Sequence, residues 1–504
     1  MNRTQKFALN SLTAMILQVV SMAAGMITPW LMISTYGSEM NGLVSSLNQF
    51  ISYLNLVEAG IGGAAIYSLY KPLAEQNHSL VSSIVIAAKK SYRQAGYIFS
   101  TGILILAVIY TLLSSTESVP GYIVFSLAII LGINGCFDFF FVAGDRVLLT
   151  AAQRNYVISF VSIINVIFKT MIIFVMTAYR MNILLLFGCA SSFVIVKAML
   201  LTWYTRKNYP YIDKKAIPDK TALEKRWEVI YQQVLGIVQS GAPTVLATIL
   251  LNLVSVSVYS VYNMIIYGVN AVLSVFISGL PAGFGELIAR REEETLRKTV
   301  SEFEVAYYYI LSIVYGLAFI LIMPFISVYT KGISDANYYY PVLGGVIVLN
   351  GLLYNIKTPQ SMLILSAGMY KETRWRVTIQ GLIIIVFGAI GGILAGLVGI
   401  MLGSCLSNLY RTIDLLFFTP KYITHSSPLK SFLRMLQVIA NIAIICSFSL
   451  LYNPTCTNYL QWVELAIVYS CWAVMVVTIS AYAFERQEFT SVMKRLISLV
   501  KRKV

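Results

Sequence analysis

The sequence contains little charge, and it lacks the cysteine and histidine patterns that bind metals. Only 12% of its 504 residues are charged, whereas 58% are hydrophobic. A soluble protein of this length needs far more polar surface to cover its core. The six cysteines form no C-x-x-C pair, and all but Cys456 lie inside apolar runs, so we interpret them as buried side chains. The two histidines lie far apart, and we expect no metal site.

Two further absences narrow the function. No G-x-x-x-x-G-K-[ST] loop for nucleotide phosphates occurs, and we expect no cofactor. The apolar run that follows Arg3 and Lys6 has no small-residue cleavage site, so it is predicted to be retained as a helix and not removed as a signal peptide.

Long apolar runs dominate what is present. A helix needs about 20 apolar residues to cross the hydrocarbon core of a bilayer, and the chain holds about fourteen such runs. The predicted fold class is therefore an all-α polytopic membrane protein. We place its spans at 12–34, 43–69, 95–113, 121–144, 156–178, 182–203, 230–252, 256–281, 305–328, 342–366, 377–396, 397–419, 435–453 and 463–484.

The distribution of Lys and Arg predicts the orientation. With the N-terminus inside, 31 of the 37 basic residues fall in inside loops, two fall in outside loops and four lie within spans. Positive charge marks the cytoplasmic side, so both termini are predicted to be cytoplasmic. The net charge of +15 is thereby explained as a topology signal, and nucleic acid is not an expected partner. The expected partners of these basic loops are the anionic lipids of the inner membrane leaflet.

The longest polar stretch, 204–229, divides the spans into six and eight. Because the chain enters and leaves this linker on the same side, six-span units before and after it would be parallel repeats. The second span of each unit carries a weakly similar pattern: Tyr36, Asn41 and the glycine-rich stretch 60–63 in the first, and Tyr259, Asn263 and the stretch 279–283 in the second. We predict an N-terminal lobe at 1–203, a cytoplasmic linker at 204–229, a C-terminal lobe at 230–419, two accessory spans within 420–484, and a basic amphipathic tail at 485–504.

Polar residues recur at helical spacing on the first two spans of each predicted lobe. Lipid-facing positions should be apolar, so such stripes indicate an interior or a cavity. A water-filled central cavity is the favoured interpretation, and hydrogen-bonding between packed helices is the alternative. The candidate lining residues are Gln18, Asn41, Asn48, Ser52, Asn55, Ser240, Thr244, Asn252, Tyr259, Asn263, Tyr267 and Asn270.

Several charged residues are predicted to lie inside spans. Glu58, on the stripe of the second span, and Asp138 are candidates for ion coupling. Asp138 and Lys197 share a depth, so a structural ion pair is an equal alternative, and Arg411 can pair with Asp414 three residues later. An unpaired cation in a cavity would attract an anionic headgroup. The candidate cations are Lys169, Lys197, Lys357 and Arg411.

Three short stretches then carry a family resemblance. They are YGSEMNGL at 36–43, YLNLVEAGIGGA at 53–64 and AAQR at 151–154. With these stretches and the fourteen-span plan, the chain resembles the multidrug/oligosaccharidyl-lipid/polysaccharide (MOP) flippase superfamily. It is most similar to the polysaccharide transporter (Wzx-type) branch.

The resemblance implies two six-helix lobes around a cavity formed by spans 1, 2, 7 and 8, with two C-terminal helices added. It implies a flippase, not an enzyme, that moves undecaprenyl-pyrophosphate-linked oligosaccharide to the outer leaflet of a bacterial cytoplasmic membrane by alternating access. An H⁺ or Na⁺ gradient would drive it, glycan polymerase or biosynthesis proteins are candidate partners, and Lys197, Lys357 and Arg411 would hold the pyrophosphate.

Departures from related branches keep one alternative open. The first span carries no charge. Lipid II flippases carry basic residues there, and multidrug and toxin extrusion (MATE) proteins often carry an acidic one. An ion-coupled small-molecule antiporter remains the alternative, with Glu58 in the place of that acidic residue. A membrane enzyme is disfavoured because the longest predicted external loop, 329–341, has only Lys331 and Asp335 as charges.

Overall fold

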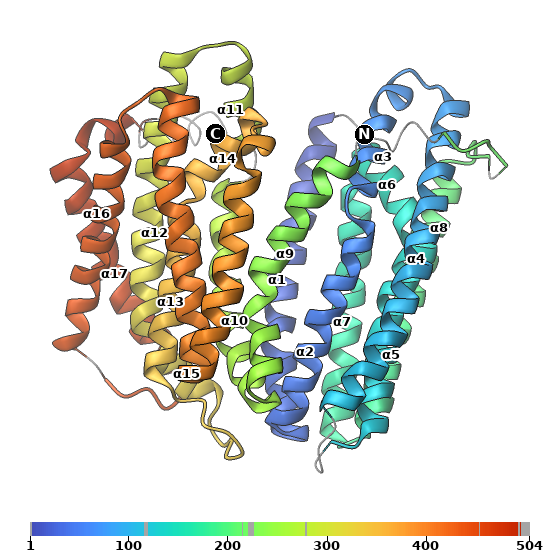
Figure 1. The fold of residues 1–504 in the computed structure, drawn as a ribbon, viewed down its shortest axis with the longest axis horizontal. Coiled ribbons are helices and arrows are strands. Elements are labelled where there is room, and N and C mark those ends of the chain that lie inside the picture. The colour runs from blue at the N-terminus through green and yellow to red at the C-terminus, as the bar shows by residue number, and fades with distance from the viewer. Residues whose placement is uncertain are drawn as a thin grey trace. The chain divides into compact units, whose positions relative to one another are not determined.

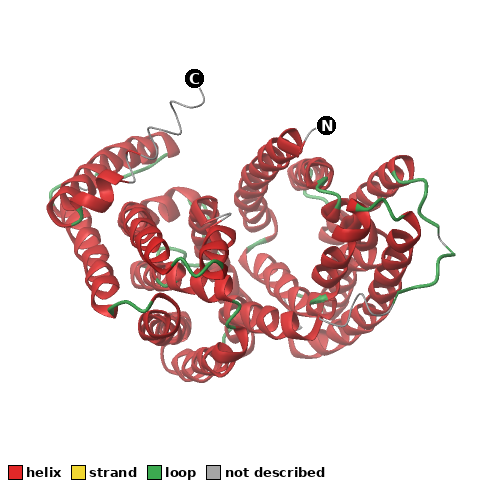
Figure 2. Cartoon of the chain, turned by 90° about the horizontal axis from the view of Figure 1, so that it is seen from above, coloured by secondary structure: helices red, strands yellow, loops and turns green. Residues whose placement is uncertain are grey.

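A computed structural model describes residues 3–114, 119–213, 215–219, 226–277, 280–452, 454–491 and 494. Within these ranges all regular structure is helical (Figures 1 and 2). By length and composition, ten helices can cross a membrane, or eleven if one bent pair is a single span. The α-helices are α1 Arg3–Tyr36, α2 Ser38–Leu54, α3 Ile61–Ala74, α4 His78–Ser114, α5 Gly121–Phe137, α6 Ala143–Ala151, α7 Asn155–Ala178, α8 Ile183–Asn208, α9 Arg226–Leu250, α10 Leu253–Ile277, α11 Leu280–Ala289, α12 Glu293–Tyr329, α13 Pro341–Ile356, α14 Thr358–Ala367, α15 Tyr370–Thr419, α16 Pro428–Ser447 and α17 Tyr459–Phe484.

The predicted all-α polytopic plan is confirmed. The bent pair α2 and α3 makes one span, and the long α15 folds back on itself and makes two. The remaining spans are supplied by α9 and by the α13–α14 pair. The rods match the predicted spans in order. Only helices satisfy their own backbone hydrogen bonds, so apolar runs of this length have no other way to cross a bilayer.

Several helices begin earlier than hydropathy predicts. Residues 78–94 and 293–304 were expected to be loops, but they form the first turns of α4 and α12. Hydropathy detects only the part of a helix that lies in hydrocarbon, whereas a polar sequence with good helix formers extends the same helix into water. Most of the described tail is also helical, from Arg486 to Ser491, while the basic residues 495–504 lie outside the described residues.

The described chain divides into two compact units. Unit 1 comprises residues 1–248 and 252–257, and unit 2 comprises residues 249–251 and 258–504. By contact, most of α9 belongs with the first unit, and the lobe boundary at residue 230, inferred from the linker, stays a prediction. The lobes as repeated sequence units remain a prediction.

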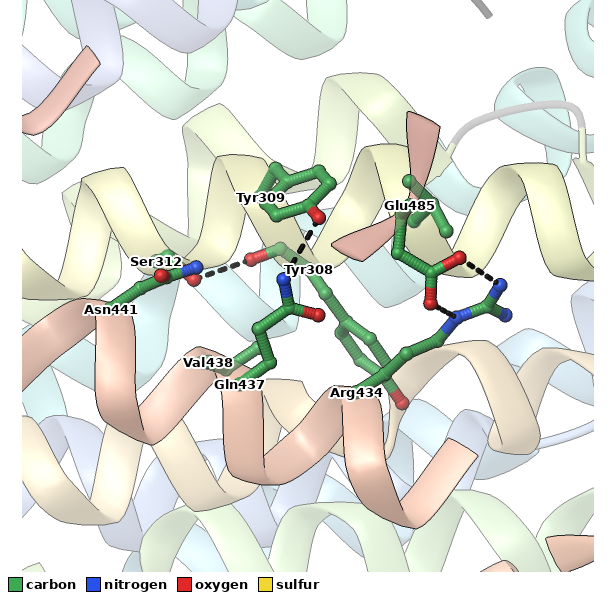
Figure 3. Close-up of a pocket in the computed structure, with 9 residues that line it drawn as sticks. Tyr308, Tyr309, Ser312, Arg434, Gln437, Val438, Asn441 and Glu485 are labelled. Atoms are coloured by element: carbon green, nitrogen blue, oxygen red, sulfur yellow. Dashed lines mark hydrogen bonds and ion pairs between the residues drawn. The ribbon is translucent and has the colours of Figure 1, made fainter. Parts of the chain in front are cut away.

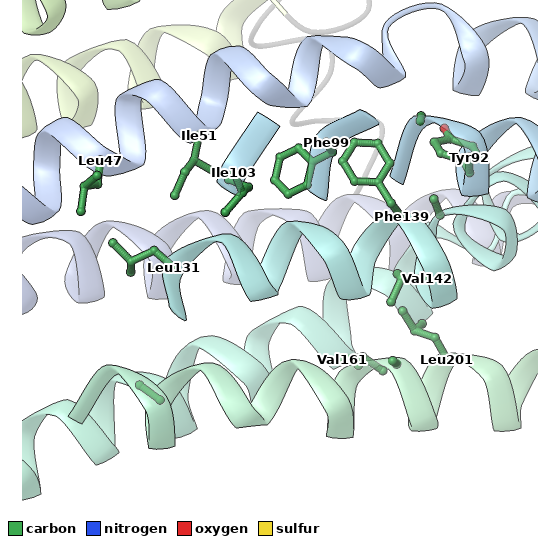
Figure 4. Packing of buried hydrophobic residues seen from close by; sticks show 14 of the residues in the cluster. Leu47, Ile51, Tyr92, Phe99, Ile103, Leu131, Phe139, Val142, Val161 and Leu201 are labelled. Carbon is green, nitrogen blue, oxygen red and sulfur yellow. The ribbon is translucent and has the colours of Figure 1, made fainter. Parts of the chain in front are cut away.

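In unit 1 one continuous apolar core joins the helices. α1 packs along α7, α4 along α5, and α8 against α5 and α7. Figure 4 shows Phe99 and Phe139 in this core, with ring centroids 5.0 Å apart. Glycine permits the close contact, because a Cβ on Gly135 would collide with the ring of Phe99.

In unit 2 the long helix α12 is the centre of packing. It contacts α13, α16 and α17. Arg434 of α16 is 3% exposed and pairs with Glu304 of α12 at 3.0 Å. It also binds both carboxylate oxygens of Glu485, at 2.8 and 3.0 Å (Figure 3). This paired charge fixes the accessory helices α16 and α17 onto α12, because removing either partner would leave a charge buried.

The predicted hairpin near residue 396 is present inside α15. Ala395 and Gly396 have non-helical dihedrals, and Gly396 has a φ of 59°, which favours glycine. The two arms then approach so closely that a Cβ on Gly391 would overlap the backbone of Gly399. Small residues at such crossings are what allow membrane helices to pack without intervening side chains.

We predict that Gly391→Ala destabilises unit 2 by about 1–3 kcal/mol, because the opposing backbone cannot move aside as a side chain can. The midpoint of thermal unfolding in detergent measures this loss. The matched control is Gly345→Ala on α13, where an added Cβ meets no atom within 4 Å. That change should leave stability unaltered or raise it, and equal shifts in both variants would contradict the close crossing.

Candidate functional site

Three of the charged residues predicted inside spans lie at irregularities of their helices. Glu58 ends a 3-10 segment, Asn55–Glu58, just before Gly60 adopts a φ of 79° and the helix bends by 41°. Asp138 begins a π-helical segment, η2 (Asp138–Val142), between α5 and α6. Lys357 is the junction between α13 and α14. Irregular turns free backbone groups, and inside a membrane they are tolerated where polar groups or water can bind them.

The break at Gly60 changes one expectation. We predicted one uninterrupted span at 43–69, with the polar stripe continuing to Gly62. The helix is interrupted at Ala59 and Gly60, so Gly62 is not on the same continuous face as Glu58. Gly60 has the left-handed conformation that L side chains rarely adopt, which is the physical reason for a stop at this residue.

In unit 1 the carboxylates are gathered around Arg146. Its guanidinium lies 2.9 Å from Glu58 and 2.9 Å from Asp138, and Lys197 lies 3.6 Å from Asp138. These side chains are between 20% and 34% exposed, so water still reaches them. Two carboxylates and two cations thus form one chain of alternating charge. We call this the Arg146 cluster.

Arg146 was missed as a site residue, because we placed it in the loop 145–155. It lies on α6, in the same rod as Asp138. Eight residues of regular α-helix would leave two side chains about 80° apart. The wider π turn between them lowers the rotation per residue and brings both onto one face. A second ion pair, Lys89–Asp145 at 2.7 Å, joins α4 to α6, and Asp145 directly precedes Arg146 in the chain.

In unit 2 a cation without a carboxylate partner lies at the α13–α14 junction. Lys357 is 7% exposed, and its ammonium donates to the Oδ1 of Asn408. It also lies 4.8 Å from the centroid of the Tyr354 ring. Among the described residues no Asp or Glu pairs with it. Asn408 is held in turn by Asn350, whose Oδ1 accepts from its amide at 2.9 Å.

More positive charge lies one turn along α15. Arg411 is 7% exposed and binds Asp414 at 2.5 Å, and Asp414 also pairs with Arg376. Asn408, which accepts from Lys357, lies three residues before Arg411 on α15. Asp414 thus pairs with two cations, and Lys357 adds a third positive charge that pairs with no carboxylate among the described residues. We call this local excess of positive charge the Lys357 cluster (Lys357, Arg376, Arg411 and Asp414).

An uncharged hydrogen-bond network extends through the same unit. The amide of Asn355 donates to Asn270 at 2.7 Å and to the hydroxyl of Tyr315 at 2.8 Å. The network links α10, α12 and α13, and Asn355 itself was not singled out from the sequence.

The predicted cation Lys169 belongs to neither cluster. It lies half-buried on α7, and no ion pair or hydrogen bond of its side chain is found among the described residues.

The predicted stripe residues divide into two kinds. Some are packed: Asn41 donates to Ser257 at 2.8 Å, and Thr244 and Tyr259 are buried. Others are open, with Tyr267 61% exposed. Exposed residues of the stripes are Asn48, Ser240, Asn252, Asn263 and Tyr267, and half-buried ones are Gln18, Ser52, Asn55 and Asn270. Hydrogen-bonding between helices therefore explains part of each stripe, and the exposed positions need another explanation.

Two local contacts show what the polar residues do structurally. Ser52 donates to the carbonyl of Gln49 at 2.7 Å, and Asn252 caps α10 by accepting from the amide of Ser255 at 2.8 Å. No group of three or more His, Cys, Asp or Glu side chains in the described part of the chain is arranged to hold a metal ion.

Comparison of this fold with solved structures identifies its class. Neither the family models nor the curated proteins that were compared match the sequence. The lipid II flippase MurJ in an inward closed conformation superimposes with a TM-score of 0.66 at 15% identity, over 95% of this chain and 99% of that one. An inward-facing multidrug resistance MATE family transporter of the MOP superfamily gives 0.65 at 11% identity, over 83% and 96%.

A MOP superfamily transporter from Pyrococcus furiosus gives a TM-score of 0.54 at 11% identity, over 88% of this chain and 96% of that one. The chain is therefore a multi-pass membrane protein with the fold of MOP-superfamily transporters. The resemblance inferred from the sequence is confirmed at this level. At these identities the likeness shows the fold alone, so the Wzx-type branch remains a prediction.

We predict that Arg146→Gln destabilises unit 1 by about 1–3 kcal/mol, because Glu58 and Asp138 lose their shared partner while they are partly shielded from water. The double variant Glu58→Gln/Arg146→Gln should recover part of this loss, since one uncompensated charge disappears. Midpoints of thermal unfolding for both variants and for Glu58→Gln complete the double-mutant cycle. Strictly additive losses would show that Arg146 does not couple to Glu58.

Proposed function

We propose that this protein is a flippase for undecaprenyl-pyrophosphate-linked oligosaccharide. It would work by alternating access in a bacterial cytoplasmic membrane, with both termini cytoplasmic. The observation that carries the proposal is the excess positive charge of the Lys357 cluster. A cation inside a membrane protein is costly unless it is paired or serves a ligand, and among the described residues the partners of Lys357 are an amide and an aromatic ring.

A pyrophosphate suits this arrangement chemically. It brings several negative charges and many acceptor oxygens, which Lys357 and Arg411 can bind as donors without displacing Asp414. Lys357 is the stronger candidate of the predicted headgroup cations, because Lys197 already pairs with Asp138. Lys169 lies on α7 of unit 1, whereas the Lys357 cluster is built from unit 2, so Lys169 has no assigned role in the proposal.

The exposed stripe residues support a hydrophilic cargo. Asn48, Asn263 and Tyr267 present amide and phenol groups at positions where lipid-facing side chains would be apolar. Such groups bind sugar hydroxyls, and an aromatic ring can stack on a sugar face.

The Arg146 cluster is the proposed coupling site. Glu58 and Asp138 compete for one guanidinium, so protonating or binding a cation at either carboxylate changes which pair is formed. The cluster also lies where α2 bends, so a change of pairing acts on a backbone that is already interrupted. H⁺ and Na⁺ both fit this description.

We expect Lys357→Gln to lower surface polysaccharide by about tenfold to a hundredfold, because a charge-assisted bond to phosphate contributes about 1.5–3 kcal/mol. The measurement is made in a strain that lacks the chromosomal gene and carries each variant at equal membrane abundance. Lipid-linked oligosaccharide on the cytoplasmic side should accumulate as the surface glycan falls.

The matched control is Lys169→Gln, which removes the same charge from α7 and should restore surface glycan to the wild-type level. If Lys357→Gln also restores it fully, the headgroup assignment is wrong. If deletion leaves the glycan intact and instead raises sensitivity to cationic dyes, the protein is the ion-coupled small-molecule antiporter.

That antiporter is the second candidate, and the Arg146 cluster favours it equally, because carboxylates that exchange partners also suit drug–ion exchange. For either cargo, Glu58→Gln should keep cargo binding but abolish the dependence of transport on the imposed ion gradient. Transport into proteoliposomes with and without a pH or Na⁺ gradient measures this. Glu75→Gln is the control, since Glu75 is exposed and pairs with Lys71, four residues earlier in the chain, at 3.8 Å. Unchanged gradient dependence in Glu58→Gln would remove Glu58 from coupling.

A further inference from the structure

A groove of about 660 Å³ runs along the outside of unit 1, between α5 with its π segment and α8. We call it the bulge groove. One wall is formed by Phe137 and Phe141, whose ring centroids are 5.4 Å apart. The facing wall is formed by Ile195 and Met199, one helical turn apart on α8. Phe141 is 57% exposed and Met199 66%, so neither wall is covered by another part of the described chain.

The π segment Asp138–Val142 produces this concave shape. Phe137 and Phe141 are four residues apart across the beginning of that segment, which widens the helix and turns Phe141 outward beside Phe137. Single exposed apolar residues are ordinary on a lipid-facing surface. A cleft that is walled on both sides and several turns long is unusual there, because an acyl chain that fills it loses conformational entropy.

The groove ends in positive charge. Trp203 lies one turn beyond Met199, and Arg206 and Lys207 follow in the last turn of α8. The ammonium of Lys207 lies 5.1 Å from the centroid of the Trp203 ring. No ion pair of Arg206 or Lys207 with an acidic side chain occurs among the described residues. An apolar channel therefore leads to two cations that remain available to an external anion.

We propose that the bulge groove binds one anionic phospholipid. Its phosphate would lie between Arg206 and Lys207, Trp203 would lie at the level of the glycerol, and one acyl chain would occupy the groove. From Ile195 to Arg206 the helix rises about 16 Å, which is close to half of the roughly 30 Å hydrocarbon core. One acyl chain of a single leaflet therefore fits the apolar length.

The predicted topology agrees with this ligand. The end of α8 that carries Arg206 and Lys207 enters the basic linker, which the distribution of Lys and Arg places on the cytoplasmic side. Anionic lipids are concentrated in that leaflet, and basic pockets between membrane helices on this side bind their headgroups. Tryptophan is favoured at the same depth, where its ring is apolar and its N–H reaches the interface.

The groove also touches the charged interior of unit 1. Thr202, on the groove floor, donates to Asp145 at 3.1 Å, and Asp145 pairs with Lys89. The same π segment begins with Asp138 of the Arg146 cluster. A bound lipid would thus rest on the segment that positions Asp138. This site is separate from the Lys357 cluster, and the proposal holds whichever molecule the protein transports.

Native mass spectrometry of the purified full-length protein tests the proposal, with phosphatidylglycerol and phosphatidylcholine of equal chain length as probes. Wild type should retain one phosphatidylglycerol in preference to phosphatidylcholine. Arg206→Gln/Lys207→Gln should weaken phosphatidylglycerol binding about 30-fold, since each basic residue near the surface contributes about a factor of five. Its binding of phosphatidylcholine should not change.

Two further variants separate the site from general surface charge. Arg290→Gln/Lys298→Gln removes the same charge from another predicted cytoplasmic segment and should bind phosphatidylglycerol like wild type. Met199→Trp fills the groove and should lower retention of both lipids. The proposal is overturned if Arg206→Gln/Lys207→Gln binds like wild type, if the Arg290→Gln/Lys298→Gln control loses as much affinity, or if Met199→Trp has no effect while its thermal unfolding is unchanged.

Discussion

A polar group inside a bilayer has no water to bind, so it must find its partner within the protein. This constraint determines most of what is seen in the chain. The backbone meets it by forming helices, and Arg434 meets it by binding Glu304 and Glu485, which attaches the accessory helices to α12. Where the constraint is only partly met, at Lys357, we propose that an external ligand binds.

The constraint also explains why charges and helix irregularities coincide. A regular helix uses its own backbone groups completely and offers nothing to a charged side chain. Glu58, Asp138 and Lys357 each lie where the helix is bent, widened or divided. At these points neighbouring elements contribute side chains, such as Arg146 for the two carboxylates and Asn408 for Lys357. Charge and irregularity together mark the two clusters more specifically than either does alone.

The structural neighbours include proteins whose names describe multidrug transport and a lipid II flippase. One fold thus carries different cargoes, and function has to be argued from the site. Here the two units differ in their electrostatics. The Arg146 cluster is balanced between acids and bases, as suits a site where partners exchange, whereas the Lys357 cluster has surplus positive charge, as suits an anion. This difference underlies the division between coupling and cargo in the proposed mechanism.

The sequence by itself determined the fold class and the order of the spans, because apolar length is a local property. Its glycines between residues 391 and 399 permitted a hairpin but did not mark the tip, which the structure places at Gly396. It also identified Glu58, Asp138, Lys357 and Arg411, since a charge within an apolar run is visible without a structure. It did not reveal Arg146 as the shared partner of Glu58 and Asp138, the break at Gly60, or Asn408 as the acceptor for Lys357. These features depend on where a helix departs from regular α-helical geometry and on which residues of different helices come within hydrogen-bond distance. Only the tertiary structure decides both.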